Sequence, residues 1–292
     1  MSRPLSSQRL AGAVAVVTGA SRGLGRLLSQ ALAESGAAVG LMARSADELT
    51  AVVREIKQAG GSAVAATGDA SQPADVERAI GHIRGRLGPI DLLVNNAGIA
   101  GPSGSTWELS PDAWWETVQV NLGSAYLCSR AALPEMVARG NGRIVNITSK
   151  AGAQRWPQQT AYAVSKAAII KLTENVAAET SSSGVCVFSV DPGLLPIGLS
   201  AAAIAGTAAP GSAEARRDAW VRRQLAAGQG AEPDRAARLV TRIAAGDADP
   251  LSGCHLSVHD NLDQMLAVAA CMQDTDCYRL RRTQPAGSAP GA

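Results

Sequence analysis

Residues 13–35 read AVAVVTGASRGLGRLLSQALAES: an apolar run, a glycine-rich turn and an amphipathic stretch follow one another. The apolar residues 13–18 favour a buried strand, and the pattern of residues 23–35 favours a helix. Glycines in the turn between them permit a tight bend and let the backbone approach a phosphate group closely. The start of the helix would offer free N–H groups and a positive dipole end to that anion. The stretch therefore predicts a dinucleotide phosphate site with these contacts: Gly19, Ser21, Arg22, Gly23, Leu24 and Gly25.

Short apolar runs and longer amphipathic stretches alternate through most of the chain. Strands are expected at residues 13–18, 37–42, 62–66, 90–94, 142–148, 185–190 and 251–258. Helices are expected between them at residues 23–35, 46–59, 73–87, 111–139 and 160–180. Strands this apolar, separated by helices, are typical of a parallel sheet that is covered on both faces. We therefore expect an α/β fold, a doubly wound, Rossmann-like parallel sheet of about seven strands with helices on both faces.

Two stretches depart from this alternation. Residues 194–212 are rich in Ala, Gly and Pro and give way to a charged helix. An irregular segment of this length in a compact domain is usually a binding loop, so we expect a substrate lid over about residues 194–230. Residues 261–282 are expected to form a helix plus tail that completes a single domain over residues 1–282. The Pro- and Gly-rich residues 283–292 are expected to form a disordered tail.

The composition narrows the class of protein. The chain has 292 residues, 46% of them hydrophobic, and a net charge of +2. This charge balance does not favour nucleic acid or a membrane surface as the partner. No apolar run reaches the roughly 18 residues that a transmembrane helix needs. Residues 1–9 lack the apolar segment of a secretory signal, so we expect a cytoplasmic protein that does not bind membranes.

The cysteines and histidines do not indicate a metal site. The five cysteines are scattered, odd in number and without a C-x-x-C pair, which argues against both a disulfide framework and zinc. Reduced cytosolic thiols are the simplest interpretation. His255 and His259 lie four residues apart, yet no glutamate follows the first as in a zinc-protease helix. We expect ordinary strand or loop histidines and no metal.

The end of the expected second strand bears on the choice of dinucleotide. An acidic residue there would bind the ribose 2′-hydroxyl. Residues 41–45 contain no acid and include Arg44 and Ser45. Arg44, with Arg22 of the glycine-rich turn, could hold a 2′-phosphate by charge-assisted hydrogen bonds, although each arginine taken singly also fits a solvated surface. The sequence therefore favours NADP(H), with Arg44 and Ser45 among the cofactor contacts.

Tyr162, Lys166 and Ser149 carry a second pattern. Tyr162 and Lys166 are four residues apart in an expected helix, so their side chains share a face. A neighbouring cation favours the phenolate and lowers the pKa of a tyrosine from its usual value near ~10. A hydroxyl from Ser149 that reached the same point could orient a substrate oxygen. Together the three residues predict a proton donor facing a carbonyl, or a base facing an alcohol.

These residues belong to a longer series of motifs. The series comprises the glycine-rich turn, Asp69, Asn95-Asn96-Ala97-Gly98, Asn121, Ser149, Tyr162 with Lys166, and Pro192-Gly193. In these motifs and their order the chain resembles the short-chain dehydrogenase/reductase family, over nearly everything from Ala13 to Val258. The resemblance implies one Rossmann-like domain and hydride transfer at a nicotinamide.

The resemblance also implies a role for each matching residue. Tyr162 would be the general acid/base, Lys166 would lower its pKa and bind the nicotinamide ribose, and Ser149 would hold the substrate oxygen. Asn121 would anchor a proton-relay water near Lys166, and Asp69 would contact the adenine. The remaining cofactor contacts implied in this way are Ala70, Asn96, Ala97, Gly98, Pro192 and Gly193.

Some of these residues also have a plainer interpretation. Asn95 and Asn96 fit a simple turn pair, and Asn121 fits a helix-kink residue. Asp69 fits a helix N-cap, since Ser71 and Pro73 follow it. As members of the ordered set, all four favour the functional interpretation.

The chain departs from the family at several positions. Four residues after Gly193 the family usually carries a threonine that contacts the nicotinamide amide, and this chain has Ile197. Lys150 stands after Ser149, where a small apolar residue is common. Residues 251–260 replace a glycine-rich ending, and the extra segment that follows could cover the site or a subunit contact.

The expected substrate is a fairly apolar small molecule, because the candidate pocket walls are apolar: Ala100, Gly101, Trp156, Leu194, Leu195 and Ile197. Trp156 fits a buried anchor or a subunit contact equally well. The leading hypothesis is a carbonyl (keto) reductase that transfers a hydride between NADP(H) and a ketone or secondary alcohol in specialised metabolite biosynthesis.

Two other functions compete with the reductase hypothesis. In the first, Tyr162 and Lys166 serve a dehydration, cyclisation or isomerisation with no net redox, for which the departure at Ile197 leaves room. In the second, the chain is a non-catalytic dinucleotide sensor, which is disfavoured because both catalytic residues are kept. Alanine-rich faces on the helices expected at residues 111–139 and 160–180 indicate a homodimer or homotetramer.

Overall fold

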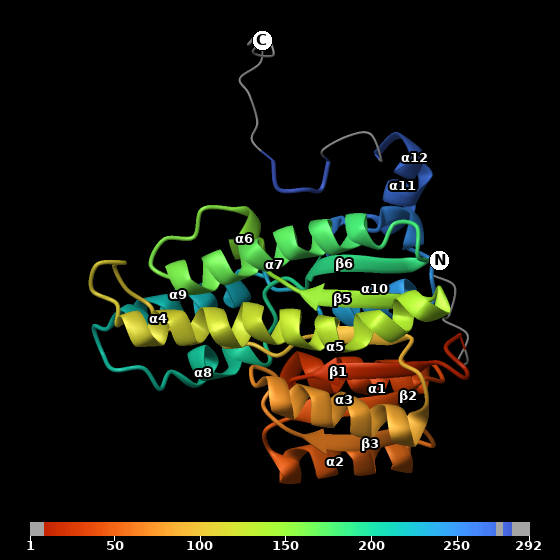
Figure 1. Ribbon diagram of the computed structural model, residues 1–292. Helices are drawn as coiled ribbons and strands as arrows, with labels where there is room; N and C mark the ends of the chain where they lie inside the picture. Colours follow the sequence, from red (N-terminus) through yellow and green to blue (C-terminus); the bar gives the residue numbers. More distant parts are fainter. Residues whose placement is uncertain (1–8, 273–276, 282–292) are drawn as a thin grey trace.

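A seven-stranded sheet forms the centre of the protein, with the strand order β3-β2-β1-β4-β5-β6-β7. The structure, a computed structural model, describes residues 9–272 and 277–281. The strands are β1 Val14–Thr18, β2 Ala38–Ala43, β3 Ser62–Thr67, β4 Leu92–Asn95, β5 Gly142–Ile147, β6 Val185–Asp191 and β7 His255–Ser257. All neighbouring strands are parallel (Figure 1), so the predicted α/β, doubly wound fold is confirmed.

Helices cover both faces of the sheet. Their bounds are α1 Gly23–Glu34, α2 Ala46–Gln58 and α10 Pro233–Ala244 on one face, and α3 Pro73–Leu87, α5 Ser124–Arg139 and α7 Thr160–Glu179 on the other. Successive strand residues point to opposite faces. Ala15 and Val17 of β1 accordingly belong to the core shared with α1, α2 and α10. Val14 and Val16 belong to the core shared with α3, α5 and α7, which explains why residues 14–17 of the strand are all apolar.

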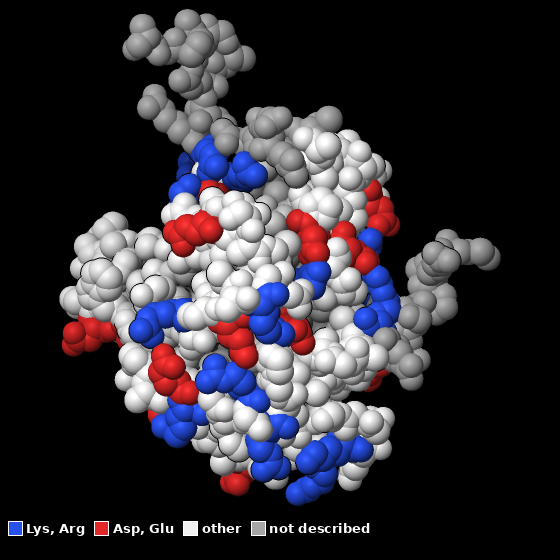
Figure 2. All heavy atoms as spheres, turned by 45° about the vertical axis from the view of Figure 1, so that its right-hand side comes forward, with Lys and Arg blue, Asp and Glu red and all other residues white. Residues whose placement is uncertain are grey.

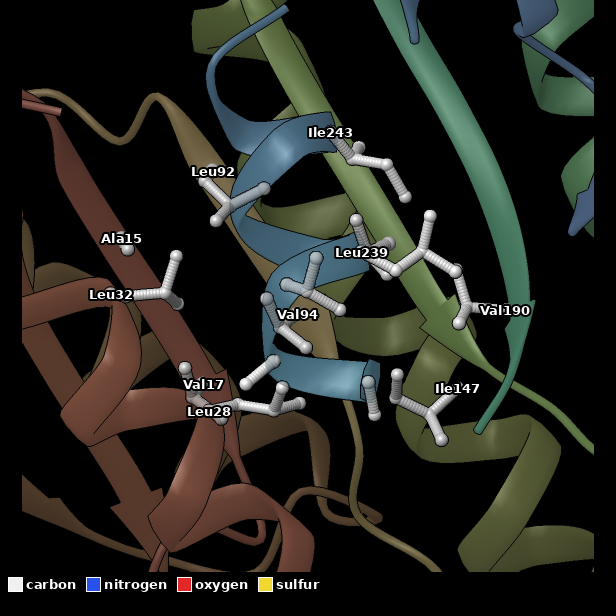
Figure 3. Packing of buried hydrophobic residues seen from close by; sticks show 14 of the residues in the cluster. Ala15, Val17, Leu28, Leu32, Leu92, Val94, Ile147, Val190, Leu239 and Ile243 are labelled. Carbon is white, nitrogen blue, oxygen red and sulfur yellow. The ribbon is translucent and has the colours of Figure 1, made fainter. Parts of the chain in front are cut away.

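Figure 3 shows the core under α1 and α10. Val17, Val94 and Ile147 come from the neighbouring strands β1, β4 and β5 and lie near Leu28 of α1 and Leu239 of α10. A fully buried aliphatic side chain of this kind contributes roughly 1.5–3 kcal/mol. The packing therefore fixes α1 and α10 against the strands that end at the site.

The order of the strands places a crevice at the carboxyl ends of β1 and β4, because the chain builds outward from that point in both directions. Further helices gather at this end of the sheet (Figure 1): α4 Pro111–Val118, α6 Lys150–Ala153, α8 Leu199–Ala205 and α9 Ala213–Ala226. The segments that connect them carry the candidate site residues.

Two predicted elements differ from the structure near the site. The helix expected over residues 111–139 is divided by a π-helical turn at Gln119–Gly123. The segment 194–212 was expected to be irregular, but it contains α8. Three consecutive alanines from residue 201 to 203 favour a helix there, and Gly206, with φ of +66°, ends it.

The C-terminal third also departs from expectation. The strand expected at residues 251–258 is only three residues long, because Pro250 lies in a 3₁₀ turn at Asp249–Leu251. Helix α10 was not predicted at all. Residues 261–282 were expected to form a helix plus tail; among the described residues of this range there are two short helices, α11 Leu262–Ala267 and α12 Ala269–Met272. The predicted tail at residues 283–292 lies outside the described residues.

Charged side chains of both signs lie beside one another over much of the face in Figure 2. Arg9 pairs with Asp247, and Arg242 pairs with both Asp247 and Asp263. Exposed pairs of this kind contribute little individually, about 0–1 kcal/mol. Among the described residues, no helix has the length and apolar character needed to cross a membrane.

Candidate active site

The glycine-rich turn joins β1 to α1 and is braced by Asn96, which follows β4. The Asn96 side-chain amide donates to the carbonyl oxygens of Thr18 and Gly19, at 2.9 and 3.2 Å. The Thr18 hydroxyl accepts from the backbone N–H groups of Asn96 and Ala97, both at 3.0 Å. Gly19 has φ of +62°, which glycine adopts without strain. Asn96 and Ala97 therefore hold the turn in shape, and their contact with a cofactor stays a prediction.

The start of α1 fits a phosphate group. Arg22 is the N-cap residue, and no side chain caps the helix, so its first N–H groups remain available to an anion. A Cβ at Gly25 would lie 2.6 Å from Asn96 Nδ2 and closer still to the Gly19 carbonyl oxygen, so a glycine is required there. Three further predicted contacts are half-buried in the same stretch: Ser21, Gly23 and Leu24. The residues present therefore fit the pyrophosphate of a dinucleotide.

Two exposed arginines, which are predicted to bind a 2′-phosphate, follow the carboxyl ends of neighbouring strands. Arg22 follows β1 and Arg44 follows β2, and these strands are neighbours in the sheet. Neither guanidinium forms an ion pair with any residue that the structure describes. The Ser45 hydroxyl accepts from Glu48 N–H at 3.4 Å and caps α2. Ser45 thus has a structural task, and both arginines are available for a phosphate.

Asp69 lies in the turn after β3 and organises that turn. One oxygen of its carboxylate accepts from the backbone N–H and the hydroxyl of Ser71, at 2.9 and 2.8 Å. Helix α3 is capped by Gln72, so the alternative interpretation of Asp69 as the helix N-cap is wrong. Ala70 is buried beside it. Both residues follow β3 at its carboxyl end; the adenine contact predicted for Asp69 and the cofactor contact predicted for Ala70 stay predictions.

Asn121 lies in the π-helical turn and holds three parts of the site together. Its side chain accepts from Ile99 N–H at 2.8 Å and donates to the Ile99 carbonyl oxygen at 3.0 Å. It also donates to the Ser165 hydroxyl at 2.9 Å, and that hydroxyl donates to the Tyr162 carbonyl oxygen at 2.7 Å. A Cβ at Gly98 would lie 3.7 Å from Lys166 Nζ, so Asn121 and its loop border the lysine.

The structure brings Ser149, Tyr162 and Lys166 together. Lys166 Nζ lies 5.7 Å from the centroid of the Tyr162 ring, one turn away on α7. The ammonium donates to the Ile147 carbonyl oxygen at 2.9 Å. Ser149 caps α6, where its hydroxyl accepts from Ala151 N–H at 3.2 Å, and it hydrogen-bonds the Tyr162 side chain. Lys150, the residue after Ser149, is exposed.

Burial dominates the electrostatics of this cluster. Loss of solvent raises the pKa of Tyr162 to about 12, against the opposing hydrogen bond from Ser149. Loss of solvent lowers the pKa of Lys166 to about 8. The sequence-based expectation that the pKa of Tyr162 is lowered is not met here, because desolvation, with the charge of Asp191 added to it, outweighs the hydrogen bond from Ser149. Tyr162 therefore keeps its proton at neutral pH and can donate it.

Asp191 is a charged residue at the site that the sequence reasoning did not single out. It ends β6, is 6% exposed, and accepts a hydrogen bond from Gly193 N–H at 3.0 Å. Its negative charge adds to the raised pKa of Tyr162. The sequence feature that could have revealed Asp191 is an acidic residue directly before Pro192, at the end of a largely apolar strand.

His255 of β7 packs behind Ser149. Its Nδ1 lies 3.1 Å from the Ser189 hydroxyl oxygen and 3.4 Å from the Thr148 hydroxyl oxygen. Burial lowers the pKa of the imidazole, although the Asp191 charge opposes this. The prediction of an ordinary strand histidine placed it in the correct element, but the sequence did not reveal its contacts. No group of three or more His, Cys, Asp or Glu in the described part of the chain could hold a metal.

The lid lies directly over the glycine-rich turn. A Cβ at Gly23 would lie 2.6 Å from the Gly198 Cα atom. Ile197, which replaces the family's threonine, packs against the core under α1 and α10, and Leu195 is buried in that core. These two predicted pocket walls therefore anchor the lid to the core. The packing of Ile197 on that core explains why an apolar residue stands at position 197.

Trp156 contacts the lid helix. Its ring lies 5.4 Å from that of Trp220 in α9, with the two planes at 89°. Both indoles are half-buried. The other predicted walls Ala100, Gly101 and Leu194 are also half-buried near the carboxyl ends of the strands.

Comparisons with known proteins agree with this arrangement. The family model described as short chain dehydrogenase matches residues 13–203. A short chain dehydrogenase of Pseudocercospora fijiensis is 41% identical over 187 residues, which is 63% of this chain and 60% of that protein. The chain thus matches less than two thirds of that relative's length. A 3-oxoacyl-[acyl-carrier-protein] reductase of Synechocystis sp. is 38% identical over 187 residues, 64% of this chain and 75% of that protein.

Solved structures show the same fold. A crystal structure of a variant actinorhodin polyketide ketoreductase with NADPH superposes with a TM-score of 0.77 at 27% identity. The match covers 86% of this chain and 97% of that chain.

Proposed function

Because the chain belongs to the short chain dehydrogenase family of oxidoreductases, we propose that it is an NADP(H)-dependent carbonyl (keto) reductase. The observation that carries the proposal is the convergence of Ser149, Tyr162 and Lys166 at the strand ends that also hold the glycine-rich turn. A half-buried proton donor beside a dinucleotide site is what reduction of a ketone requires.

Each residue of the cluster has one task in this reaction. NADP(H), when bound, supplies the hydride for reduction or accepts it for oxidation. The Ser149 hydroxyl holds the substrate oxygen. Tyr162, which is protonated because of its raised pKa, gives its phenolic proton to that oxygen as negative charge develops on it. The Lys166 ammonium stabilises the tyrosinate left behind, and the same groups act in reverse on a secondary alcohol.

The cofactor preference rests on Arg22 and Arg44. Both guanidiniums are exposed, and residues 41–45 offer no carboxylate to a ribose 2′-hydroxyl. A 2′-phosphate would gain charge-assisted hydrogen bonds from either arginine. The test compares kcat/KM with NADPH and NADH at equal concentration; a preference for NADH would refute this assignment.

A fairly apolar ketone of specialised metabolism fits the site best. The predicted pocket walls Ala100, Gly101 and Trp156 carry no charge. The names of two similar proteins specify ketone reduction, one on an acyl-carrier-protein substrate and one on a polyketide. A panel of such ketones, followed at the NADPH absorbance band, should find substrates.

A second candidate keeps Tyr162 and Lys166 as an acid/base pair without net redox. The observation that favours it is Ile197, which packs on the core where the family offers a hydroxyl to the nicotinamide amide. The two candidates differ in stoichiometry. One NADPH consumed for each alcohol formed supports the reductase, whereas product formed without NADPH consumption supports the alternative.

We also propose a cytoplasmic homodimer or homotetramer whose partner is a small molecule, not nucleic acid or a membrane. Large apolar side chains are exposed on three helices near one another: Trp115 on α4, Tyr126 on α5 and Val164 on α7. Light scattering after gel filtration tests the assembly; a monomer at micromolar concentration would contradict it.

A further inference from the structure

The tryptophans of this chain are concentrated at one end of the sheet. The chain has only nine aromatic residues in all, of which five are Trp, three Tyr and one Phe. The five tryptophans lie in three segments at the carboxyl ends of the strands: residues 101–118 carry Trp107, Trp114 and Trp115, residues 154–159 carry Trp156, and α9 carries Trp220. In Figure 1, α4, α6 and α9 gather at the left, at this end of the sheet.

Hydrogen bonds join the first segment to the loop before α7. Gly104 N–H donates to the Gln158 carbonyl oxygen at 2.9 Å, across 54 residues of sequence. The Trp114 indole N–H donates to the Thr160 hydroxyl at 3.1 Å. Thr160 begins the helix that carries Tyr162 two residues later. These hydrogen bonds connect residues 101–118 to residues 154–159. Together with α9, we call these two segments the rim of the site.

The lid helix α9 closes the other side of the same rim. Ser103 N–H donates to the Glu214 carboxylate at 3.1 Å, and Arg217 donates to the Ser103 hydroxyl at 3.4 Å. Arg217 is itself fixed by Asp218, which is 2% exposed. These bonds set the position of α9 and hence of Trp220, one turn from Arg217.

Trp156 and Trp220 form a perpendicular pair across this rim. Their ring centroids are 5.4 Å apart and their planes meet at 89°. The Trp156 indole N–H donates to the Gln159 side-chain oxygen at 3.1 Å, which fixes the ring four residues before α7 begins at Thr160. Both indoles keep part of their surface open. A perpendicular pair offers an incoming flat ring one indole face and one indole edge, the two geometries that aromatic rings prefer.

Resting on the ketoreductase function proposed above, we infer that Trp156 and Trp220 select the substrate class: ketones fused to a flat aromatic ring. The flat ring stacks on one indole and meets the edge of the other. The carbonyl of a ketone held in this way would lie toward Ser149 and Tyr162, because residues 154–159 connect α6, which Ser149 caps, to α7, which carries Tyr162. A saturated ring system of the same size has no flat face and gains no such contact.

The test compares two ketones with the same carbon skeleton, α-tetralone, which has an aromatic ring, and α-decalone, which is saturated. Wild-type protein should show higher kcat/KM for the tetralone. Trp156→Leu and Trp220→Leu should each lower kcat/KM for the tetralone about tenfold, the order of one aromatic contact together with its apolar area. The decalone shares the apolar contact but not the ring stacking, so its kcat/KM should fall at least about threefold less than that of the tetralone in the same variants. Trp107→Leu is the matched control, because Trp107 is 86% exposed on the rim.

The outcomes separate this inference from the function on which it rests. Turnover of the decalone in a variant also shows that the variant is folded. Equal losses for both ketones would mean that the pair only fastens the lid, and the inference would be wrong. Unchanged kinetics in both variants would overturn it as well. If the wild type oxidises NADPH with neither ketone nor any other carbonyl compound, the proposed reductase function itself fails.

Discussion

Replacing Asn121 by leucine should destabilise the protein strongly, although the two side chains have similar size. Asn121 is 1% exposed and makes three side-chain hydrogen bonds, two with the Ile99 backbone and one with Ser165. Leucine would leave the Ile99 N–H and carbonyl groups without those partners. Each unmet buried group costs about 1–3 kcal/mol, so we expect a loss of about 3 kcal/mol in the free energy of unfolding. For a domain of this size that corresponds to a fall in Tm of roughly 6–12 °C.

Thermal unfolding of Asn121→Leu, followed by far-ultraviolet circular dichroism, measures this loss. Asn141→Leu is the matched control, because Asn141 is exposed and its side chain makes a single 3.3 Å hydrogen bond to Asp91. Surface changes of this kind usually stay within about 0.5 kcal/mol. A Tm for Asn121→Leu within about 2 °C of the wild type would refute the reasoning that this side chain braces the π-helical turn.

Three further predictions concern the cofactor site and the pH dependence of stability. Gly25→Ala should abolish NADPH binding in a fluorescence titration, because its Cβ would overlap the Gly19 carbonyl oxygen; wild-type affinity would contradict the fit of the turn. Arg44→Ala should weaken NADPH binding about 10-fold or more and leave NADH binding nearly unchanged, since only NADPH carries the 2′-phosphate; equal losses would argue against that contact. Burial lowers the pKa of His255 in the folded protein. As the pH falls below about 6.5, the imidazole is therefore protonated in the unfolded chain before it is protonated in the folded protein, and the folded protein loses stability. Wild-type urea midpoints should therefore fall between pH ~7.5 and ~5.5, and His255→Asn should show a smaller fall while exposed His82→Asn behaves like the wild type.

The central sheet could be predicted from sequence because each strand is nearly all apolar and each is separated from the next by a helical pattern. Val14 and Val16 serve one core while Ala15 and Val17 serve the other, so a single run of five residues reveals that both faces are covered. The glycine-rich turn could likewise be predicted, because its backbone conformation is local and glycine is the residue that adopts it without strain.

Features that depend on distant partners could not be predicted in the same way. The π-helical turn at Asn121 is fixed by Ile99 and Ser165, which lie 22 and 44 residues away. The contacts of His255 with Ser189 and Thr148 join β7 to β6 and to the residue that follows β5. Helix α10 was missed although its sequence contains the signal, a proline at its start followed by Ala236, Leu239, Val240 and Ile243 at helical spacing.

The electrostatics of Tyr162 show the same limit. The i, i+4 spacing correctly predicted that Lys166 lies beside it, but spacing carries no information about burial. Desolvation is the largest effect on the phenol; it raises the pKa and keeps Tyr162 protonated at neutral pH. The sequence therefore predicted the pair, and the structure supplies the protonation state in which it acts.

The most direct test of the account is ketone reduction by Tyr162→Phe. The variant keeps the ring that packs over Lys166 and removes only the hydroxyl that bonds Ser149. Loss of a general acid usually costs about 10²–10⁴-fold in rate. We predict a fall of that order in kcat at the NADPH absorbance band with unchanged NADPH affinity, and no fall for Tyr126→Phe on the exposed face of α5. Wild-type turnover by Tyr162→Phe would contradict the claim that this phenol is the proton donor.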